Sequence, residues 1–276
     1  MNSIIPYIGG KHRAAREIAK RLHATGADTL VDVFGGSASV LLNAGFKKRI
    51  YNDASGDLVV FFQVLADDVN RRVLIRRLRY TPPSRQIFDQ YHDLYIRGCF
   101  SLSLIKDPVE RACAVFYRHC FSFGGKVHNG GFAVSTGNRH GIKEIVRYHN
   151  TLRRLISIGH FFRETMIEHK DYSKIISLYG VKPNVVLFVD PPYDGTERYY
   201  SMLFSRADHV FLAHQLSDCR AKVVCTYYDS PLIRELYPDN RWIWERIEAT
   251  KNSQFRSGYK VKSEECILIR KEVPIR

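Results

Sequence analysis

The hydrophobic pattern of the first 66 residues alternates between helical and extended spacing. In 12–22 the apolar residues Ala15, Ile18 and Leu22 recur at intervals that place them on one helix face. The expected order is a helix at 12–22, a strand at 29–34, a Gly-rich turn, a helix at 40–45, a strand at 49–53 and a helix at 56–65. A strand, turn, helix and second strand form a βαβ unit, so this pattern predicts a parallel sheet.

The pattern changes near Ala66, where helical and basic residues continue to about Thr81. The run 71–79 carries five arginines, and Pro82-Pro83 ends the helix. Its charged face indicates either a solvated helix or one that faces a DNA backbone. Two further helical patterns occupy 84–98 and 107–120, and 121–141 is rich in Gly, aromatic, basic and amide residues. This last segment predicts an exposed hairpin or long loop.

The alternation of helices and strands resumes at residue 142. The expected elements are a helix at 142–158, a short strand near 165–169, a helix after Asp171, a strand at 185–189, a helix at 206–218, a strand at 222–227 and paired strands near 241–248 and 261–270. The sequence therefore predicts one α/β core made of 1–66 and 142–276, interrupted by an insertion at 67–141. Its sheet is expected to be mostly parallel, with a C-terminal antiparallel hairpin.

The charge of the chain narrows the classes of partner. Of the 276 residues, 42 are Lys or Arg and 28 are Asp or Glu, giving a net charge of +14. A basic protein that binds a phosphate backbone releases condensed counterions, so the positive charge favours nucleic acid as the partner. A solvated basic surface or an acidic membrane as the partner is the alternative.

Cysteine, histidine and apolar runs exclude other classes. The six cysteines contain no C-x-x-C pair and the eleven histidines show no metal-ligand spacing, which disfavours a disulfide framework or a metal site. No apolar run approaches the roughly 18 residues that span a bilayer, and the first residues lack the order of a secretory signal. We therefore expect a cytoplasmic protein without a metal or a membrane anchor.

The glycine turn "VDVFGGSAS" (31–39) lies where an open α/β sheet binds a nucleotide, after the first strand of the βαβ unit. Gly35 and Gly36 allow a sharp turn and close approach of a ligand. Asp53 ends the next strand, 17 residues after Gly36, where a carboxylate accepts ribose hydroxyls. There is no G-x-G-x-x-G or G-K-[ST], which disfavours dinucleotides and triphosphates. A tight turn with a strand-ending acid is the alternative.

The segment "DPPY" (190–193) follows the apolar strand 185–189. Asp190 offers a hydrogen-bond acceptor, and Pro191 and Pro192 have no backbone N–H, so their surroundings offer only carbonyl acceptors. Tyr193 supplies a flat ring. Two acceptors beside an aromatic ring suit the exocyclic amino group of a base, whose nitrogen becomes nucleophilic when its hydrogens are accepted. A proline-rich turn after a core strand is the alternative.

These motifs together resemble the Dam-type (D12-class) DNA adenine-N6 methyltransferases. The segments "PYIGGK" (6–11), "DVFGGSAS" (32–39), "YND" (51–53) and "DPPY" (190–193) occur in the order of that family. The resemblance implies a Rossmann-like methyltransferase core with S-adenosyl-L-methionine as cofactor. It implies cofactor contacts from Tyr7, Lys11, Phe34, Gly35, Gly36, Ser37, Ala38, Asp53, Asp171, Tyr172 and Asp190, although a helix cap is an equally good interpretation of Asp171. Ala38 stands where the family often has Gly.

The resemblance further implies that an adenine is flipped out of duplex DNA and methylated at N6, with Asp190, Pro191, Pro192 and Tyr193 catalytic and Tyr193 stacking on the base. The insertion would read the DNA. Candidate DNA contacts are Arg118, Phe121, Phe123, Lys126, His128, Asn129, Asn138 and Arg139. Phe121 or Phe123 is expected to fill the gap left by the flipped base. The Asn-Gly-Leu-x-Arg pattern of enzymes that read GATC is absent, so no recognition sequence is predicted. A restriction endonuclease is a candidate partner, and a monomer or a dimer is expected.

Three alternatives remain from the sequence. An RNA adenine methyltransferase would use a similar tetrapeptide, and a basic nucleic-acid-binding protein would keep the fold without activity. Against the latter stand the intact Lys11, Asp53 and Asp190. A protein-glutamine or cytosine-N4 methyltransferase is disfavoured, since the resemblance to those enzymes implies Asn or Ser before Pro-Pro-Tyr.

Overall fold

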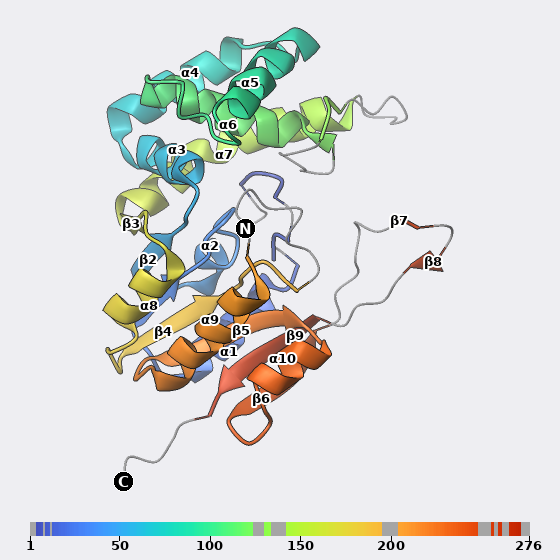
Figure 1. The fold of residues 1–276 in the computed structure, drawn as a ribbon. Helices are drawn as coiled ribbons and strands as arrows, with labels where there is room; N and C mark the ends of the chain where they lie inside the picture. Colours follow the sequence, from blue (N-terminus) through green and yellow to red (C-terminus); the bar gives the residue numbers. More distant parts are fainter. Residues whose placement is uncertain are drawn as a thin grey trace. The chain divides into compact units, whose positions relative to one another are not determined.

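The structure, a computed structural model, describes residues 4–7, 9–11, 13–123, 130–133, 142–194, 204–247, 255–256, 259–260 and 265–271. The chain divides into two compact units, shown as a ribbon in Figure 1. One, here called the helical unit, consists of Met1–Gly10, Gly36–Ser39 and Asp53–His169. The other, the sheet unit, consists of Lys11–Gly35, Val40–Asn52 and Lys170–Arg276.

The sheet unit alternates helices and strands along the chain. Its elements are α1 (Ala15–Ala24), β1 (Thr29–Asp32), α2 (Leu41–Ala44), β2 (Lys48–Asn52), α8 (Tyr172–Tyr179), β4 (Val185–Val189), α9 (Arg206–Asp218), β5 (Lys222–Tyr228), α10 (Pro231–Leu236), β6 (Trp242–Ile247), β7 (Phe255–Arg256), β8 (Tyr259–Lys260) and β9 (Glu265–Arg270). Each strand and helix predicted for this part of the chain is present. The helix α10, which begins with Pro231 after the N-cap residue Ser230, was not predicted.

Within the sheet unit, the strands of the main sheet follow the order β2-β1-β4-β5-β9-β6. The short strand β3 (Met166–Glu168) belongs to the helical unit. Strand β1 pairs in parallel with β2 and β4, and β4 pairs in parallel with β5. Strand β9 is antiparallel to both β5 and β6. The predicted fold class, a mostly parallel α/β sheet with a C-terminal antiparallel pair, is therefore confirmed.

Strand β4 is buried on both faces. Val185, Leu187 and Val189 belong to one apolar cluster with residues of α8 and α9, and Val186 and Phe188 on the opposite face are buried as well. A continuous apolar strand in a parallel sheet is typical of such double burial. The core thereby fixes the end of β4, from which the chain continues to Asp190.

The C-terminal strands are arranged differently from a simple hairpin at the sheet edge. Strand β9 lies between β5 and β6, because it pairs with β5 through Val224–Tyr228 as well as with β6. Its antiparallel direction places its first residue, Glu265, beside Tyr228 at the end of β5. The beginning of β9 therefore lies at the same edge of the sheet as the carboxyl ends of β4 and β5.

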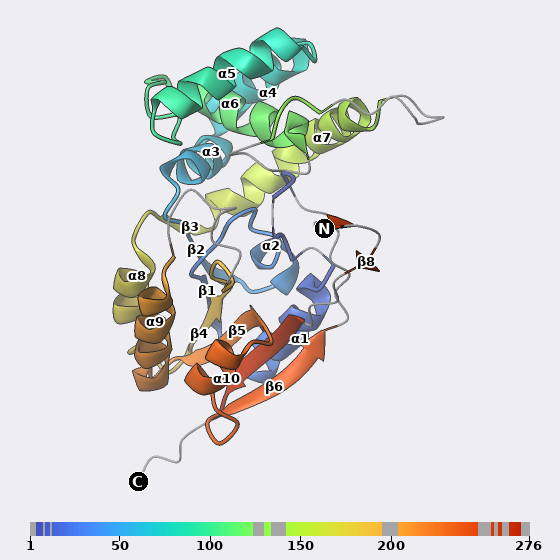
Figure 2. The same ribbon diagram turned by 45° about the vertical axis from the view of Figure 1, so that its right-hand side comes forward.

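The helical unit contains five helices (Figure 2) within its described residues. They are α3 (Gly56–Ala66), α4 (Asp68–Tyr80), α5 (Arg85–Arg97), α6 (Pro108–Phe121) and α7 (Lys143–Arg163). Side-chain caps begin three of them: Asp67 caps α4, Ser84 caps α5 and Asp107 caps α6. All five helices were predicted at these positions.

Aromatic packing joins α3 and α7 to the helices of the predicted insertion. The Phe62 ring of α3 stacks on Phe162 of α7 with centroids 4.2 Å apart. The Phe116 ring of α6 lies 6.2 Å from Phe61 of α3 and 5.4 Å from Tyr148 of α7. The change in packing therefore falls at Asp53 and His169, outside the boundaries expected at 66 and 142. A compact unit is not a functional boundary, so the assignment of 67–141 to target recognition stays a prediction.

The described ends of 121–141 have the hydrogen bonds of an antiparallel hairpin. Ser122 and Phe132 form an antiparallel bridge, the Phe123 N–H donates to the Gly131 carbonyl, and the Ala133 N–H donates to the Phe121 carbonyl. These bonds agree with a hairpin. Among the described residues, no helix is both long and apolar enough to cross a membrane.

Candidate active site

Asp190 lies directly after β4, and partners from two other parts of the chain hold both of its oxygens. The Thr226 hydroxyl of the neighbouring strand β5 donates to Oδ1 at 2.6 Å. The Lys11 ammonium, which precedes α1, lies 2.9 Å from Oδ2. A carboxylate has about four lone-pair sites, so Asp190 keeps capacity to accept a further hydrogen.

Lys11 is shared between two carboxylates. Its side chain is only 7% exposed, and its ammonium lies 3.2 Å from Oε1 of Glu265 at the start of β9. The same Glu265 oxygen accepts the Tyr193 hydroxyl at 2.7 Å, and the ammonium lies 4.7 Å from the centroid of the Tyr193 ring. Asp190, Lys11, Glu265 and Tyr193, with Thr226, form one polar network, called here the Asp190 network.

Burial governs the protonation of this network. It raises the pKa of Asp190, whereas Lys11 and the Thr226 hydroxyl oppose that rise and the negative Glu265 adds to it. Burial also raises the pKa of Tyr193 well above its ordinary value, helped by the charges of Asp190 and Glu265. Tyr193 is therefore a neutral donor, and Lys11 is the group that favours an ionised Asp190.

The Tyr193 ring is largely covered within the sheet unit. Only 6% of the residue is exposed, and the ring lies edge-on to Tyr228 at 4.5 Å and tilted against Tyr227 at 5.7 Å. Pro191 is buried and Pro192 partly buried, and neither has a backbone N–H to donate. The stacking of Tyr193 on a substrate base stays a prediction.

Two of the predicted cofactor residues are in contact beside a third aromatic ring. The Phe34 ring after β1 stacks on Tyr172 of α8 at 5.6 Å, and Phe204 lies within 5.9 Å of both. Asp171 is the N-cap residue of α8, where it accepts the Ser173 N–H at 2.9 Å. The cap interpretation of Asp171 is thus confirmed, and a cofactor contact from it stays a prediction.

Position 35 has room only for glycine, because the ring of Tyr51 lies against it. A Cβ atom at this position would lie 2.2 Å from the ring of Tyr51, and the Gly35 N–H donates to the Asn52 carbonyl at 2.7 Å. The buried Asn52 side chain donates to the carbonyls of Val33 and Lys170 and accepts the Lys170 N–H. Asn52 therefore links the chain at Val33 and Gly35 to the chain just before α8.

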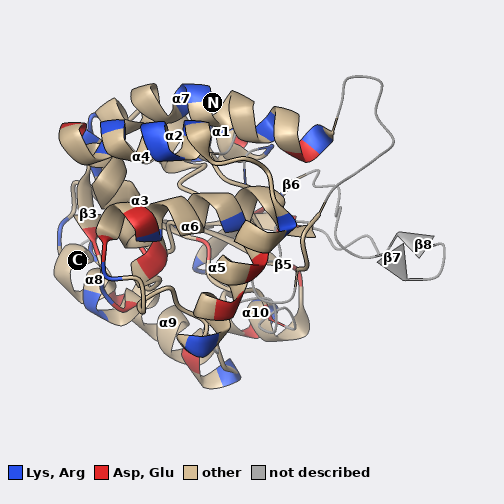
Figure 3. Cartoon of the chain, turned by 90° about the horizontal axis from the view of Figure 1, so that it is seen from above, with Lys and Arg blue, Asp and Glu red and all other residues tan. Residues whose placement is uncertain are grey.

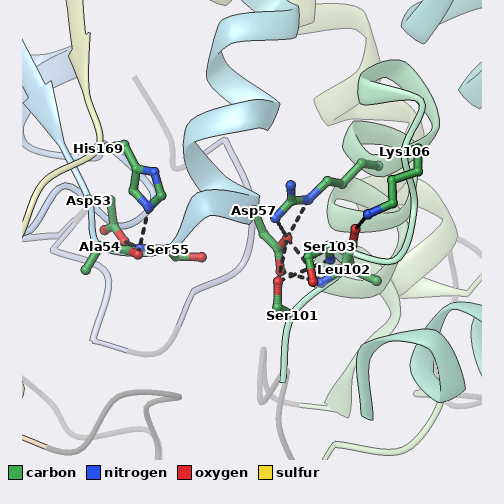
Figure 4. Close-up of polar contacts among 10 residues, drawn as sticks. Asp53, Ala54, Ser55, Asp57, Ser101, Leu102, Ser103, Lys106 and His169 are labelled. Atoms are coloured by element: carbon green, nitrogen blue, oxygen red, sulfur yellow. Dashed lines mark hydrogen bonds and ion pairs between the residues drawn. The ribbon is translucent and has the colours of Figure 1, made fainter. Parts of the chain in front are cut away.

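In the helical unit, Asp53 is held by backbone N–H groups (Figure 4). Its Oδ1 accepts the Ser55 N–H at 2.7 Å. Its Oδ2 accepts the Gly36 N–H at 2.8 Å. Burial raises the pKa of Asp53, while these two bonds and the charge of His169 oppose the rise. The ring of His169 lies 3.1 Å from the Ala54 carbonyl.

The glycine turn continues in this unit with strained backbone. Gly36 has φ +50° and a Cβ there would lie 3.1 Å from the Tyr7 ring, which itself stacks on His119 at 5.7 Å. Ala38 has φ +55°, a conformation that favours glycine, and it is buried together with Ser37. This conformation is consistent with the frequent Gly at the Ala38 position of the resembled family.

A second buried carboxylate anchors the helices of this unit. Asp57, in the first turn of α3, accepts the Leu102 N–H at 2.9 Å and pairs with Arg111 of α6 at 2.6 Å (Figure 4). Asp57 lies four residues after Asp53 in the sequence, so the segment that holds Asp53 is tied through α3 to α6 and to Leu102 before it.

Three of the predicted DNA contacts lie in the described residues, and two of them are buried. Arg118 is 1% exposed, and its guanidinium lies 3.6 Å from the centroid of the Tyr95 ring. Phe121 is fully buried against Tyr117 and Tyr148. Phe123 is 68% exposed, so of the two phenylalanines it is the one available to DNA. Lys126, His128, Asn129, Asn138 and Arg139 lie outside the described residues.

The basic run 71–79 divides between structural and surface positions. Arg71 is buried and bonds to the Leu65 carbonyl and Asp68, and Arg77 pairs with Asp107 at 2.7 Å. The other three arginines of the run, Arg72, Arg76 and Arg79, are exposed. Figure 3 shows the Lys and Arg positions along α4 and α7.

Sequence reasoning missed three residues of these arrangements: Thr226, Glu265 and Asn52. Thr226 and Glu265 are far in sequence from Asp190, and no motif assigned a role to either residue. A signal was present, since Thr226 directly follows the apolar run 223–225 and Glu265 directly precedes the apolar run 266–269. Within the described part of the chain, no group of three or more His, Cys, Asp or Glu residues is arranged to hold a metal ion.

The comparisons with known proteins agree with this geometry. The family model for D12 class N6 adenine-specific DNA methyltransferases matches residues 7–252. Similar proteins include the DNA N-6-adenine-methyltransferase of Escherichia phage P1, 26% identical over 91% of this chain and 33% of the phage protein. The retron Ec67 DNA adenine methylase of Escherichia coli is 24% identical over 98% of this chain and 91% of its own length. The DNA adenine methylase of Serratia marcescens is 26% identical over 85% of this chain and 86% of its own.

The chain thus spans a third of the phage relative and about nine-tenths of the other two. The family match covers well over half of the chain, includes the glycine turn, and contains Lys11, Asp53 and the Asp190–Tyr193 segment. The family implies a methyl donor and DNA as the substrate. This chain belongs to the D12 class N6 adenine-specific DNA methyltransferases.

Proposed function

We propose that this protein transfers the methyl group of S-adenosyl-L-methionine to N6 of an adenine flipped out of duplex DNA. The observation that carries this proposal is the position of Asp190. Its carboxylate lies at the carboxyl end of the central strand β4, accepts the Thr226 hydroxyl and pairs with Lys11, whose charge opposes the rise in the pKa of Asp190 that burial causes. That edge of an open α/β sheet is where such folds bind their ligands.

The side chains fit S-adenosyl-L-methionine. A carboxylate such as Asp53, which keeps lone pairs beyond its two backbone bonds, suits ribose hydroxyls. Phe34 and Tyr172 present aromatic rings that suit a planar adenine. The proposed cofactor contacts are Tyr7, Lys11, Phe34, Gly35, Gly36, Ser37, Ala38, Asp53, Asp171, Tyr172 and Asp190.

Asp190 and the carbonyl groups beside the prolines act in catalysis as hydrogen-bond acceptors for the adenine amino group. An adenine amino nitrogen is a poor nucleophile because its lone pair is delocalised into the ring. Asp190 accepts one N6 hydrogen and a carbonyl beside Pro191 accepts the other, so the lone pair becomes localised on nitrogen. When bound, S-adenosyl-L-methionine supplies a methyl carbon on a positively charged sulfur, and that sulfur keeps the bond's electron pair as the carbon passes to N6. Asp190 would orient the amine for this in-line displacement and, as the adjacent acceptor, take the one proton that the methylated nitrogen must release.

The insertion 67–141 is proposed to recognise the DNA. Phe123 is exposed and hydrophobic, which suits a side chain that fills the gap left by a flipped base. Lys126, His128, Asn129, Asn138 and Arg139 remain proposed contacts. Arg118 and Phe121 are buried, so a DNA contact from either requires a conformation in which it is exposed.

The test is to supply the protein with tritiated S-adenosyl-L-methionine and either duplex DNA or structured RNA. Label in DNA alone, recovered as N6-methyladenine after nucleoside digestion, is the expected result. Label in RNA alone would favour the RNA methyltransferase, and N4-methylcytosine would contradict the assignment of the base. A cytoplasmic location, a cognate restriction endonuclease and the state of monomer or dimer stay predictions.

A further inference from the structure

The Asp190 network contains a carboxylate to which no motif assigns a role. Glu265 is the first residue of β9, and it is buried. The antiparallel pairing of β9 with β5 brings it to the edge of the sheet where β4 ends, beside Tyr228. Burying a carboxylate costs free energy unless the group is paired, and the partners of Glu265 are Lys11 and Tyr193.

We propose that Glu265 is a positioning residue for methyl transfer, acting on Asp190 through Lys11 and on Tyr193 through its hydroxyl. This inference rests on the proposed function. Lys11 lies 2.9 Å from Asp190 and 3.2 Å from Glu265, so the ammonium divides its attraction between two carboxylates. The Tyr193 hydroxyl donates to the same oxygen of Glu265 at 2.7 Å, which fixes the ring of the catalytic tetrapeptide.

The division of charge matters because Asp190 must be both ionised and a strong acceptor. A lysine paired with Asp190 alone would favour the ionised form of Asp190. The same positive charge would, however, weaken the carboxylate as an acceptor for the amine hydrogen of the substrate. Glu265 offsets part of that positive charge and so preserves the acceptor strength of Asp190. Among the described residues, the other titratable groups that interact with Asp190 are Tyr193, Cys225 and Tyr227, all of them neutral because burial raises the pKa of each. Glu265 and Lys11 are therefore the charges that set its acceptor strength.

The direction of the effect follows from these charges. The negative Glu265 raises the pKa of Asp190, so Glu265→Gln lowers that pKa. Because the ionised carboxylate of Asp190 is the stronger acceptor of the amine hydrogen, the acidic limb of the kcat profile moves to lower pH in this variant. Its plateau falls, by about tenfold, because Asp190 is a weaker acceptor and Tyr193 is held less firmly.

The experiment measures kcat and KM against pH for the wild type, Glu265→Gln and Glu245→Gln. Glu245 is the matched control, since it lies on the neighbouring strand β6 and pairs with Arg21. A lower plateau together with an acidic limb at lower pH supports the proposal, while the control keeps the wild-type profile. A lower plateau with an unmoved limb would mean that Glu265 only supports the fold, and an unchanged profile would remove any role; both overturn the proposal.

A second measurement needs no activity. Carbon-13 NMR of proteins labelled at the aspartate carboxyl carbon gives the pKa of Asp190, assigned by the signal lost in Asp190→Asn. We expect a lower pKa in Glu265→Gln and in Glu265→Ala, with wild-type circular dichroism reporting that each variant folds. An unshifted Asp190 overturns the proposal even if the enzyme is active. If the pKa of Asp190 shifts in these variants while the wild-type protein methylates no DNA, the proposed function is overturned instead. That result would leave intact the sharing of Lys11 between Asp190 and Glu265.

Discussion

Asp190 in the sheet unit and Asp53 in the helical unit are acids that each follow a buried strand, yet they are held in different ways. Side chains from distant parts of the sequence hold Asp190: Thr226 at 2.6 Å and Lys11 at 2.9 Å. Backbone N–H groups of Ser55 and Gly36 hold Asp53. For both, burial raises the pKa and these partners oppose it.

The difference indicates how each carboxylate is used. A backbone N–H has no side chain that a mutation can remove, so the orientation of Asp53 is fixed by the local turn. Side-chain partners give Asp190 an acceptor strength that depends on several separate residues. An acid that only grips a ligand suits the first arrangement, whereas an acid whose basicity decides a reaction suits the second.

The largest effect is expected from Asp190→Ala. Removing the acceptor at the reacting amine should lower kcat by about 10²- to 10³-fold while S-adenosyl-L-methionine still binds. Tritium transfer to duplex DNA measures the first quantity and titration calorimetry the second. Near wild-type transfer would mean that Asp190 is not the acceptor, and Asp190 and Asp53 would then no longer differ in their roles.

Asp53→Ala should act on cofactor affinity instead. Loss of a charged hydrogen bond to a hydroxyl is worth about 1.5–3 kcal/mol, so the Kd of S-adenosyl-L-methionine should rise by roughly 10- to 150-fold. The rate at saturating cofactor should change much less. Calorimetry and initial rates at high cofactor concentration separate the two. A fall in kcat without weaker binding would give Asp53 a part in the reaction and contradict its assignment as a gripping residue.

Thr226→Val tests whether side chains tune Asp190. The Thr226 hydroxyl stabilises the ionised carboxylate, so its removal raises the pKa of Asp190 and moves the acidic limb of the kcat profile to higher pH. This direction is opposite to that expected for Glu265→Gln. The plateau should fall by about threefold to tenfold, the worth of one ordinary hydrogen bond. Rates measured from pH 5 to pH 9 decide the sign, and a limb that moves to lower pH would contradict the assignment.

The smallest effect is expected from His169→Gln. The charge of His169 opposes the raised pKa of Asp53, so its loss should raise that pKa slightly and begin the acid-side loss of cofactor affinity at a higher pH. The effect stays small because the two backbone bonds remain. Calorimetry at several pH values measures it. If the pKa of Asp53 shifted more in His169→Gln than the pKa of Asp190 shifts in Thr226→Val, side chains would tune both carboxylates. The two acids would then not differ in how they are held.

Sequence patterns predicted the local elements well because their causes are local. Helical spacing of apolar residues located α3 and α7, the prolines at 82–83 ended α4, and the apolar run before Asp190 gave β4. The glycine turn and the acids after the strands were also predictable, since each depends on a few adjacent residues. The limits of the helical unit were not predictable, because Phe62 and Phe162 pack with each other across a long sequence separation. The insertion at 67–141 itself stays a prediction.

The candidate contacts in the insertion show the same limit. Residue type suggested Arg118 and Phe121 as DNA contacts, but packing within the helical unit buries both, and only Phe123 of the described candidates is exposed. An arginine on a predicted helix gives no sign of the face on which it lies beneath neighbouring helices. Burial is a property of the assembled helices and not of the residue.

The sequence by itself determined the family, the order of strands and helices along the chain, and the two acids at strand ends, since motifs and periodicity are encoded in neighbouring residues. Only the tertiary structure decided the partners of Asp190. The antiparallel insertion of β9 beside β5 brings Glu265 to the same edge as Lys11, and the pairing of β5 with β4 places Thr226 against the carboxylate. Such contacts depend on which strands become neighbours, a consequence of how the whole sheet buries its apolar faces.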